Sequence, residues 1–167
     1  MKPFLNVPFL PDENYIEYIN SNSAGIDSLH FSLMGDRRLD NRVDPRSITN
    51  LDTIIRMVEQ VTVKNKYLLL NSLFYGPDLL IKKEHLAHLI DCLDQCAEAG
   101  VVKGIIYRDQ FLLQSLSAEA PELAKSLEAV PGSNTMLDSP AKISSHLAYI
   151  EETNFCLPSK LTLDRSL

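Results

Sequence analysis

Six short apolar runs recur along the chain, and each ends in polar residues before a helix-like segment or a polar loop begins. Parallel strands need crossover connections that are usually helical, so strands alternating with helical patterns predict βα units around one parallel sheet. The runs are centred near Val7, Leu29, Leu69, Ile105, Val130 and Leu161. We therefore predict an α/β fold whose strands all run in the same direction.

Start and stop signals for helices lie between these runs. Asp12 precedes a helical pattern as an N-cap, and Ser139 precedes Pro140, a residue favoured in the first turn of a helix. Gly25 and Gly100 follow helical patterns, as C-terminal capping glycines do. Apolar residues at helical spacing predict helices within 54–61, 86–97, 111–127 and 143–150.

Two architectures accommodate such units, a doubly wound open sheet and an eight-stranded barrel. The length of 167 residues suits the open sheet, since a barrel of the TIM type typically needs about 250 residues. The strand ends favour the barrel, because nearly every strand ends in a polar side chain and a barrel brings all those ends to one mouth. We predict a partial TIM-type barrel of about six parallel strands, with 1–167 forming a single incomplete domain.

Composition argues against several classes of partner. The formal net charge of -6 disfavours nonspecific binding to nucleic acid, which clustered Lys and Arg drive. No apolar stretch approaches the roughly 20 residues needed to span a bilayer, and the N-terminus lacks the pattern of a secretory signal. Three cysteines without a short-loop framework are typical of free thiols in a reducing compartment. We expect a cytoplasmic protein with no membrane or nucleic-acid partner.

Polar side chains at the ends of the runs form the first candidate site. Asn71, Asp109 and Ser133 end the third, fourth and fifth runs, Arg165 follows the sixth, and His30 lies in the second as an outlier. At one barrel mouth, Asp109 could act as a general base and Arg165 could bind a carboxylate through two hydrogen bonds. The alternative is structural, because Asn, Asp and Ser also cap helices where a strand gives way to a helix.

The polar stretch 35–50 is a second candidate, since it is long for a βα loop, where about 2 to 6 residues are usual. Its arginines suit carboxylate or phosphate recognition, and Arg37 and Arg38 are the candidates for substrate binding. The alternative is a solvated loop in which aspartates pair with the arginines and contribute little stability.

A stripe of possible metal ligands lies on the best-predicted helix: His85, His88, Cys92 and Cys96 share one face. At 1.5 Å per residue the stripe spans about 16 Å, whereas zinc ligands lie about 2 Å from the ion. At most two neighbours could share one ion. We therefore predict buried structural cysteines and no metal site.

Several segments resemble the collagenase-like peptidases, peptidase family U32. The similarity in order and spacing covers most of the chain. It rests on five segments, which are 25–33, 67–71 (Tyr-Leu-Leu-Leu-Asn), 100–109 (Gly-Val-Val-Lys-Gly-Ile-Ile-Tyr-Arg-Asp), 132–135 (Gly-Ser-Asn-Thr) and 161–167. One departure is Ser166, where the family has Glu after the arginine of its sixth strand. The family's cysteine-containing signature lies downstream of that strand, so the resemblance implies the N-terminal part of a longer barrel.

What the resemblance implies about function leaves alternatives open. Its members are named as peptidases, and relatives take part in RNA or quinone hydroxylation, some with an iron–sulfur cluster on cysteines of the later region. None of those positions maps onto Cys92, Cys96 or Cys156, so we expect no cofactor within this chain.

The first hypothesis is an enzyme, such as a peptidase-like hydrolase, that binds a small polar or peptide-like substrate at the strand ends. The second is a noncatalytic scaffold or a fragment completed by a partner segment, with a homo-oligomer left open. A receiver-type open domain is a weaker third, because Asp12 alone matches its acidic cluster poorly.

Overall fold

The computed structural model describes residues 5–33, 50–70, 82–161 and 163. In these residues a parallel sheet with strand order β1-β2-β3-β4-β5 alternates with helices, which confirms the predicted α/β fold. The strands are β1 (Leu5–Pro8), β2 (Ile26–Phe31), β3 (Asn65–Leu70), β4 (Gly104–Tyr107) and β5 (Glu128–Pro131). The helices are α1 (Glu13–Ser21), α2 (Leu51–Glu59), α4 (Lys83–Glu98), α5 (Gln110–Glu119), α6 (Pro121–Ser126) and α7 (Pro140–Glu151), with short 3-10 helices η1 (Ser23–Gly25) and η3 (Ser133–Thr135).

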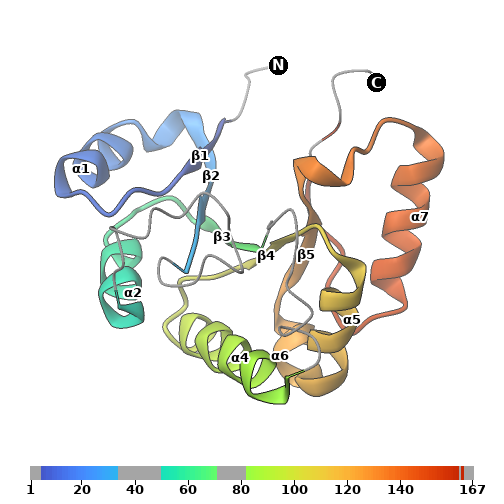
Figure 1. The fold of residues 1–167 in the computed structure, drawn as a ribbon. Helices are drawn as coiled ribbons and strands as arrows, with labels where there is room; N and C mark the ends of the chain where they lie inside the picture. Colours follow the sequence, from blue (N-terminus) through green and yellow to red (C-terminus); the bar gives the residue numbers. More distant parts are fainter. Residues whose placement is uncertain (1–4, 34–49, 71–81, 162, 164–167) are drawn as a thin grey trace.

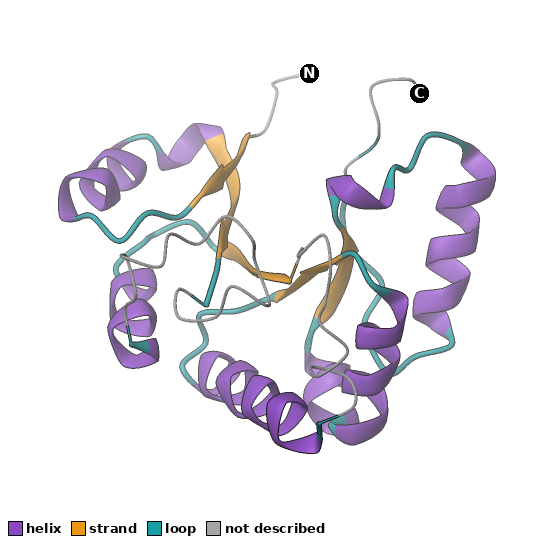
Figure 2. Cartoon of the chain, in the orientation of Figure 1, coloured by secondary structure: helices purple, strands orange, loops and turns teal. Residues whose placement is uncertain are grey.

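The sheet curves into an open arch, and the helices lie along its outer side (Figure 1). Coloured by secondary structure, the strands form the inner layer and the helices the outer layer (Figure 2). This arrangement is consistent with part of a TIM-type barrel.

Side chains cover both faces of the sheet at β3 and β4, which explains why Tyr67 to Leu70 is apolar without alternation. Leu68 and Leu70 of β3 belong to the large core between the sheet and the helices. Tyr67 and Leu69 alternate with them and form a smaller cluster with Ile106 and Val130. Because successive side chains of a strand point to opposite faces, this second cluster lies on the inner face of the arch.

The predicted helix starts are confirmed. The backbone N–H of Tyr15 donates to Asp12 Oδ1 at 2.8 Å, and that of Lys142 donates to Ser139 Oγ at 3.3 Å. Pro140 occupies the first turn of α7. These side chains satisfy backbone donors that the first turn of a helix leaves unpaired.

The two capping glycines differ in their roles. Gly100 has φ +67° and ends α4 in a Schellman motif, in which Val101 N–H donates to Cys96 O at 3.0 Å. The prediction for Gly25 was wrong, because α1 ends at Ser21 and Gly25 ends the 3-10 helix η1 instead.

The described residues show no strand at Leu161 or Leu163, where the apolar run predicted the sixth strand. Residue 162 is outside the described residues. A single parallel bridge instead joins Glu128 to Cys156, beside β5. Pro158 follows two residues later, and proline has no N–H to continue a ladder. The described residues therefore form five strands rather than about six.

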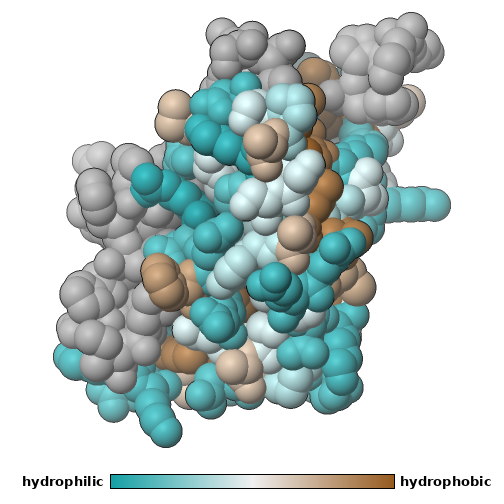
Figure 3. All heavy atoms as spheres, turned by 90° about the vertical axis from the view of Figure 1, so that its right-hand side faces the viewer, coloured by the Kyte–Doolittle hydropathy of each residue, from teal (hydrophilic) through white to brown (hydrophobic). Residues whose placement is uncertain are grey.

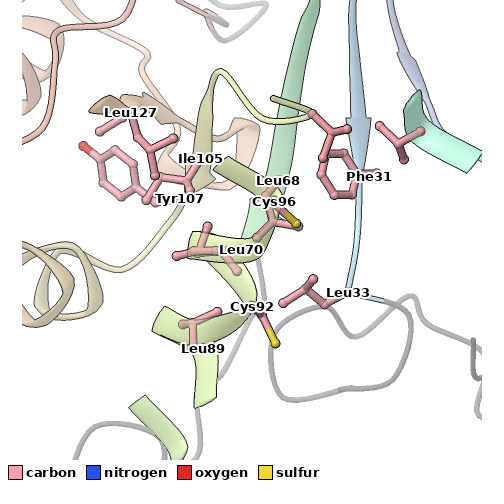
Figure 4. Packing of buried hydrophobic residues seen from close by; sticks show 14 of the residues in the cluster. Phe31, Leu33, Leu68, Leu70, Leu89, Cys92, Cys96, Ile105, Tyr107 and Leu127 are labelled. Atoms are coloured by element: carbon pink, nitrogen blue, oxygen red, sulfur yellow. The ribbon is translucent and has the colours of Figure 1, made fainter. Parts of the chain in front are cut away.

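The cysteines of the α4 stripe are structural, as predicted. Cys92 is 7% exposed and Cys96 is 0% exposed. Burial raises the pKa of the Cys96 thiol to about 12, so it stays protonated at neutral pH. Figure 4 shows the two side chains among aliphatic residues of the outer core, including Leu33, Leu68, Leu70 and Leu89.

The outer layer presents a mixed surface. Figure 3 shows that the side of the molecule formed by α7 is mostly hydrophilic, with a narrow strip of hydrophobic atoms along it. Of the helices in the described part of the chain, none combines the length and the apolar character needed to cross a membrane.

Candidate functional site

A pocket of about 370 Å³ lies on the inner face of the arch. Its apolar wall comes from the inner cluster, with Tyr67 and Leu69 on β3, Ile106 on β4 and Val130 on β5. Six polar side chains also line the pocket, together with Leu5, Gly132 and Leu161. The polar six are Asn6, Asp27, Ser28, His30, Ser133 and Lys160. The pocket thus combines an apolar wall with polar groups from several strands.

His30 and Asn6 form the best-defined polar contact in this pocket. Asn6 on β1 is paired in register with Ser28 of β2, and His30 lies two residues further along the same strand. Ser28 and His30 therefore point to the same face of the sheet. His30 Nδ1 lies 2.8 Å from Asn6 Oδ1, which is hydrogen-bond distance.

A charged network lies near the amino ends of β4 and β5, in contact with Tyr67 of the pocket wall. Lys103 Nζ lies 3.0 Å from Glu128 Oε1, and the Tyr67 hydroxyl donates to Glu128 Oε2 at 2.9 Å. Ser159 Oγ donates to the same oxygen at 3.2 Å. Burial by itself would raise the pKa of Glu128, but the hydrogen bonds from Lys103 and Tyr67 outweigh it and lower that pKa. Glu128 is therefore ionised at neutral pH.

A second ion pair lies beside this network. Lys160 pairs with Asp27 at the start of β2. Ser159 contacts β5 and Lys160 contacts β2, so the segment after α7 crosses the inner face at the amino ends of the strands. Because catalytic residues of barrel enzymes lie at the opposite, carboxyl ends, we assign these two ion pairs a structural role.

The structure brings together two of the predicted site residues. His30 and Ser133 both line the pocket, although they come from opposite halves of the sheet. Asp109 follows β4 but is not among the residues that line it. Its carboxylate accepts a hydrogen bond from Leu112 N–H at 3.0 Å and caps α5. This is the structural alternative for Asp109, and its catalytic role stays a prediction.

Asn71, Arg37, Arg38 and Arg165 lie outside the described residues. Their roles in substrate binding and catalysis stay predictions. Among the residues that the structure describes, no three His, Cys, Asp or Glu side chains gather closely enough to hold a metal ion.

Several residues of the pocket were absent from the predicted site. Asn6 lies within β1 and lines the pocket, although the predicted site did not include it. Tyr67 reads as part of an apolar run, yet its hydroxyl contacts Glu128. Ser28 could have been found from the sequence, because its two-residue spacing from His30 places both polar side chains on one face of a buried strand.

Comparison with known proteins identifies the fold. No family model matches the chain, and none of the curated proteins does. The solved structure of the U32 peptidase Mk0906 is similar, with a TM-score of 0.62 and 15% sequence identity. The match covers 98% of this chain and 60% of that peptidase chain. The chain therefore has a fold like that of the U32 peptidase over somewhat more than half of that protein's length, and membership of the family stays a prediction.

Proposed function

We propose that the inner face of the arch binds a small polar or peptide-like substrate, with the polar contacts made towards the carboxyl ends of the strands. The observation that carries the proposal is that His30 and Ser133 open onto one pocket with an apolar wall. Its volume of about 370 Å³ is within the range of about 300 to 1,000 Å³ usual for small-molecule sites. Such sites typically combine apolar walls with a few placed polar groups.

The chemistry of the pocket suits a peptide-like ligand. The apolar wall would contact a substrate side chain, while His30 and Ser133 would hydrogen-bond to its amide groups. Since the structural neighbour is a peptidase, hydrolysis of a peptide bond is the reaction class to test first. In that reaction Asp109 would act as general base, and Arg165 would hold a substrate carboxylate.

Binding can be tested with a panel of capped tripeptides, beginning with acetyl-Gly-Pro-Ala-amide, followed by amide NMR shifts. We expect shifts at the pocket and an approximately tenfold loss of affinity in His30→Gln, the size of one lost hydrogen bond of about 1.4 kcal/mol. His88→Gln is the matched control, because His88 is exposed on α4. Equal affinity of His30→Gln and the wild type, or shifts confined to the outer helices, would refute the proposal.

The role of Asp109 can be separated from its role as a helix cap. Asn caps a helix about as well as Asp, so Asp109→Asn keeps the contact with Leu112 N–H but removes the carboxylate. We expect Asp109→Asn to abolish turnover of a peptide substrate with an unchanged melting temperature. Asp109→Ala should lose turnover and also about 1 kcal/mol of stability. Full turnover by Asp109→Asn would leave capping as the only role of this residue.

A second candidate function is a noncatalytic module whose barrel is completed by a partner segment. The observation that favours it is that β1 is an outer strand of the described sheet, and that the match spans 60% of the peptidase chain. An open strand edge readily pairs with another strand. Light scattering coupled to size exclusion tests this candidate: a stable oligomer or a complex with a partner supports it, and a well-behaved monomer counts against it.

A further inference from the structure

We infer that the outer surface between α4 and α5 binds a second copy of this chain, with the two copies related by a two-fold axis perpendicular to both helices. The inference goes beyond the proposed function, which concerns the inner face of the arch. The surface contains a groove of about 700 Å³, here called the α4–α5 groove. The groove lies in the outer helical layer of the arch (Figure 1).

Phe111 is the feature that marks this groove as an interface. Its side chain is 71% exposed, more than any other large hydrophobic side chain that the structure describes. Ile90 of α4 and Ala118 of α5 line the same groove and extend its apolar surface. Aromatic side chains such as Phe are enriched in the cores of protein–protein interfaces. A partner that covered Phe111 would therefore remove apolar surface from water.

The two helices run in the same direction along the groove. The strands β3, β4 and β5 are parallel neighbours, with α4 between β3 and β4 and α5 between β4 and β5. Each helix therefore begins at the carboxyl edge of the sheet and runs towards its amino edge. The groove extends from Lys83 to Asp91 on α4 and from Phe111 to Glu119 on α5. Its first end is thus basic and its second end acidic.

The charges of the groove complement those of a second copy. A two-fold axis perpendicular to the helices places each helix antiparallel to its own copy, so residues at equal distances from the axis meet. An axis level with Ala87 brings Lys83 of each chain opposite Asp91 of the other. Both side chains are exposed. Within one helix they lie about 12 Å apart along the axis, too far to pair with each other.

The same axis also matches the apolar part of the groove. Phe111 and Ala118 lie about two turns apart on one face of α5, and the point midway between them falls between Gln114 and Ser115. An axis at that level brings the ring of Phe111 in each copy against the small side chain of Ala118 in the other. Because the groove covers equal lengths of α4 and α5, one axis makes both matches.

The alternative two-fold arrangement is disfavoured by charge. An axis parallel to the helices would stack α4 of one copy on α5 of the other in the same direction, with Asp91 against Glu119. Like charges across an interface are destabilising. The charge pattern therefore selects the antiparallel arrangement, and a second copy supplies the charged and the apolar match together.

Sedimentation equilibrium of the full chain, from about 1 to about 300 µM, measures this association. We expect a reversible dimer in the wild type. Phe111→Ser should weaken the dimer about tenfold or more, as the loss of a central aromatic contact does. Tyr18→Ser is the matched control, because Tyr18 is 64% exposed on α1 and does not line the groove. This control should leave the dissociation constant unchanged.

A charge swap tests the antiparallel register between the two copies. Lys83→Asp and Asp91→Lys should each weaken self-association about fivefold, since each places like charges opposite one another twice in the dimer. An equimolar mixture of the two variants should associate about as tightly as the wild type. In that mixed dimer every reversed side chain faces an opposite charge.

The outcomes separate this dimer from the other proposals. A monomer at every concentration, equal dissociation constants for Phe111→Ser and Tyr18→Ser, or a mixture no tighter than its two components would overturn the inference. The charge variants alter only exposed side chains, so they decide the question even if Phe111→Ser does not fold. An oligomer that resists all of these substitutions would also overturn it and would favour the edge of β1 as the interface. Peptide binding at the inner face is independent of each of these results.

Discussion

Gly104 offers a sharp test of how closely β4 and β5 approach each other. A Cβ added at this position would lie 2.3 Å from the carbonyl oxygen of Glu128 and 2.8 Å from its Cβ. Ordinary contact begins at 3.4 Å, so the nearest backbone atom would have to move by more than 1 Å. Because that atom belongs to β5 rather than to a flexible side chain, Gly104→Ala must push β4 and β5 apart.

The cost can be worked from the contacts that would be disturbed. Overpacking of a well-packed site costs about 1 to 3 kcal/mol. Separation of the strands would also weaken the hydrogen bond from Glu128 N–H to Lys103 O, which measures 3.0 Å, for about 1 kcal/mol more. We expect Gly104→Ala to lower the free energy of unfolding by about 3 kcal/mol, equivalent to a fall in melting temperature of about 6 to 12 °C for a chain of this size.

Two other glycines provide matched controls. A Cβ at Gly25 would meet no atom within 4 Å, and its backbone does not have positive φ, so Gly25→Ala should change stability by less than about 0.5 kcal/mol or raise it slightly. Gly100 also has open space but has φ +67°, so Gly100→Ala should cost about 1 kcal/mol from backbone strain alone. Urea unfolding followed by far-ultraviolet circular dichroism gives each free energy. If Gly104→Ala were no less stable than Gly100→Ala, the close approach of β4 and β5 would be refuted.

Two further predictions concern charge and thiols. The lowered pKa of Glu128, relative to its ordinary value of 4.5, means that the unfolded chain binds a proton there more readily than the folded chain. This contribution to stability is therefore present above pH 4.5 and is lost as the pH falls through the folded pKa. Chemical unfolding should show Glu128→Gln less stable than the wild type by about 1 to 2 kcal/mol near neutral pH, with the difference shrinking under acid; a constant difference would contradict the assignment. Among the thiols, Cys156 is exposed while Cys92 and Cys96 are buried, so Ellman's reagent should label one thiol rapidly in the native protein. Cys156→Ser should abolish that fast phase, and rapid labelling of a second thiol would contradict the packing of α4.

Local chemistry explains where the sequence predicted the elements well. Asp12 and Ser139 cap helices because an Asp or Ser side chain can reach the free N–H groups of the adjacent turn without help from the rest of the fold. Gly100 is predictable for a similar reason, since glycine adopts positive φ at little cost. The prediction failed at Gly25, where the chain ends α1 earlier and inserts a 3-10 turn before β2.

The candidate site was only partly predictable, because it depends on neighbours that are distant in the sequence. Ser133 was predicted from its place at the end of a strand and His30 as an outlier within one, and both line the pocket. Asn6 was left out of the predicted site, since its contact with His30 depends on the register between β1 and β2. Asp109 has the residue type of a catalytic base, but its observed contact is the cap of α5.

The sequence by itself determined the order of strands and helices, the parallel direction of the strands and the burial of the α4 cysteines. These follow from the period of apolar residues and from capping chemistry, which act over a few residues. Only the tertiary structure decided that the sheet curves, which side chains share its inner face, and that Lys103, Glu128 and Tyr67 meet there. The physical reason is that strand register and curvature are set by packing between elements, and a shift of one residue would turn each of these side chains to the opposite face.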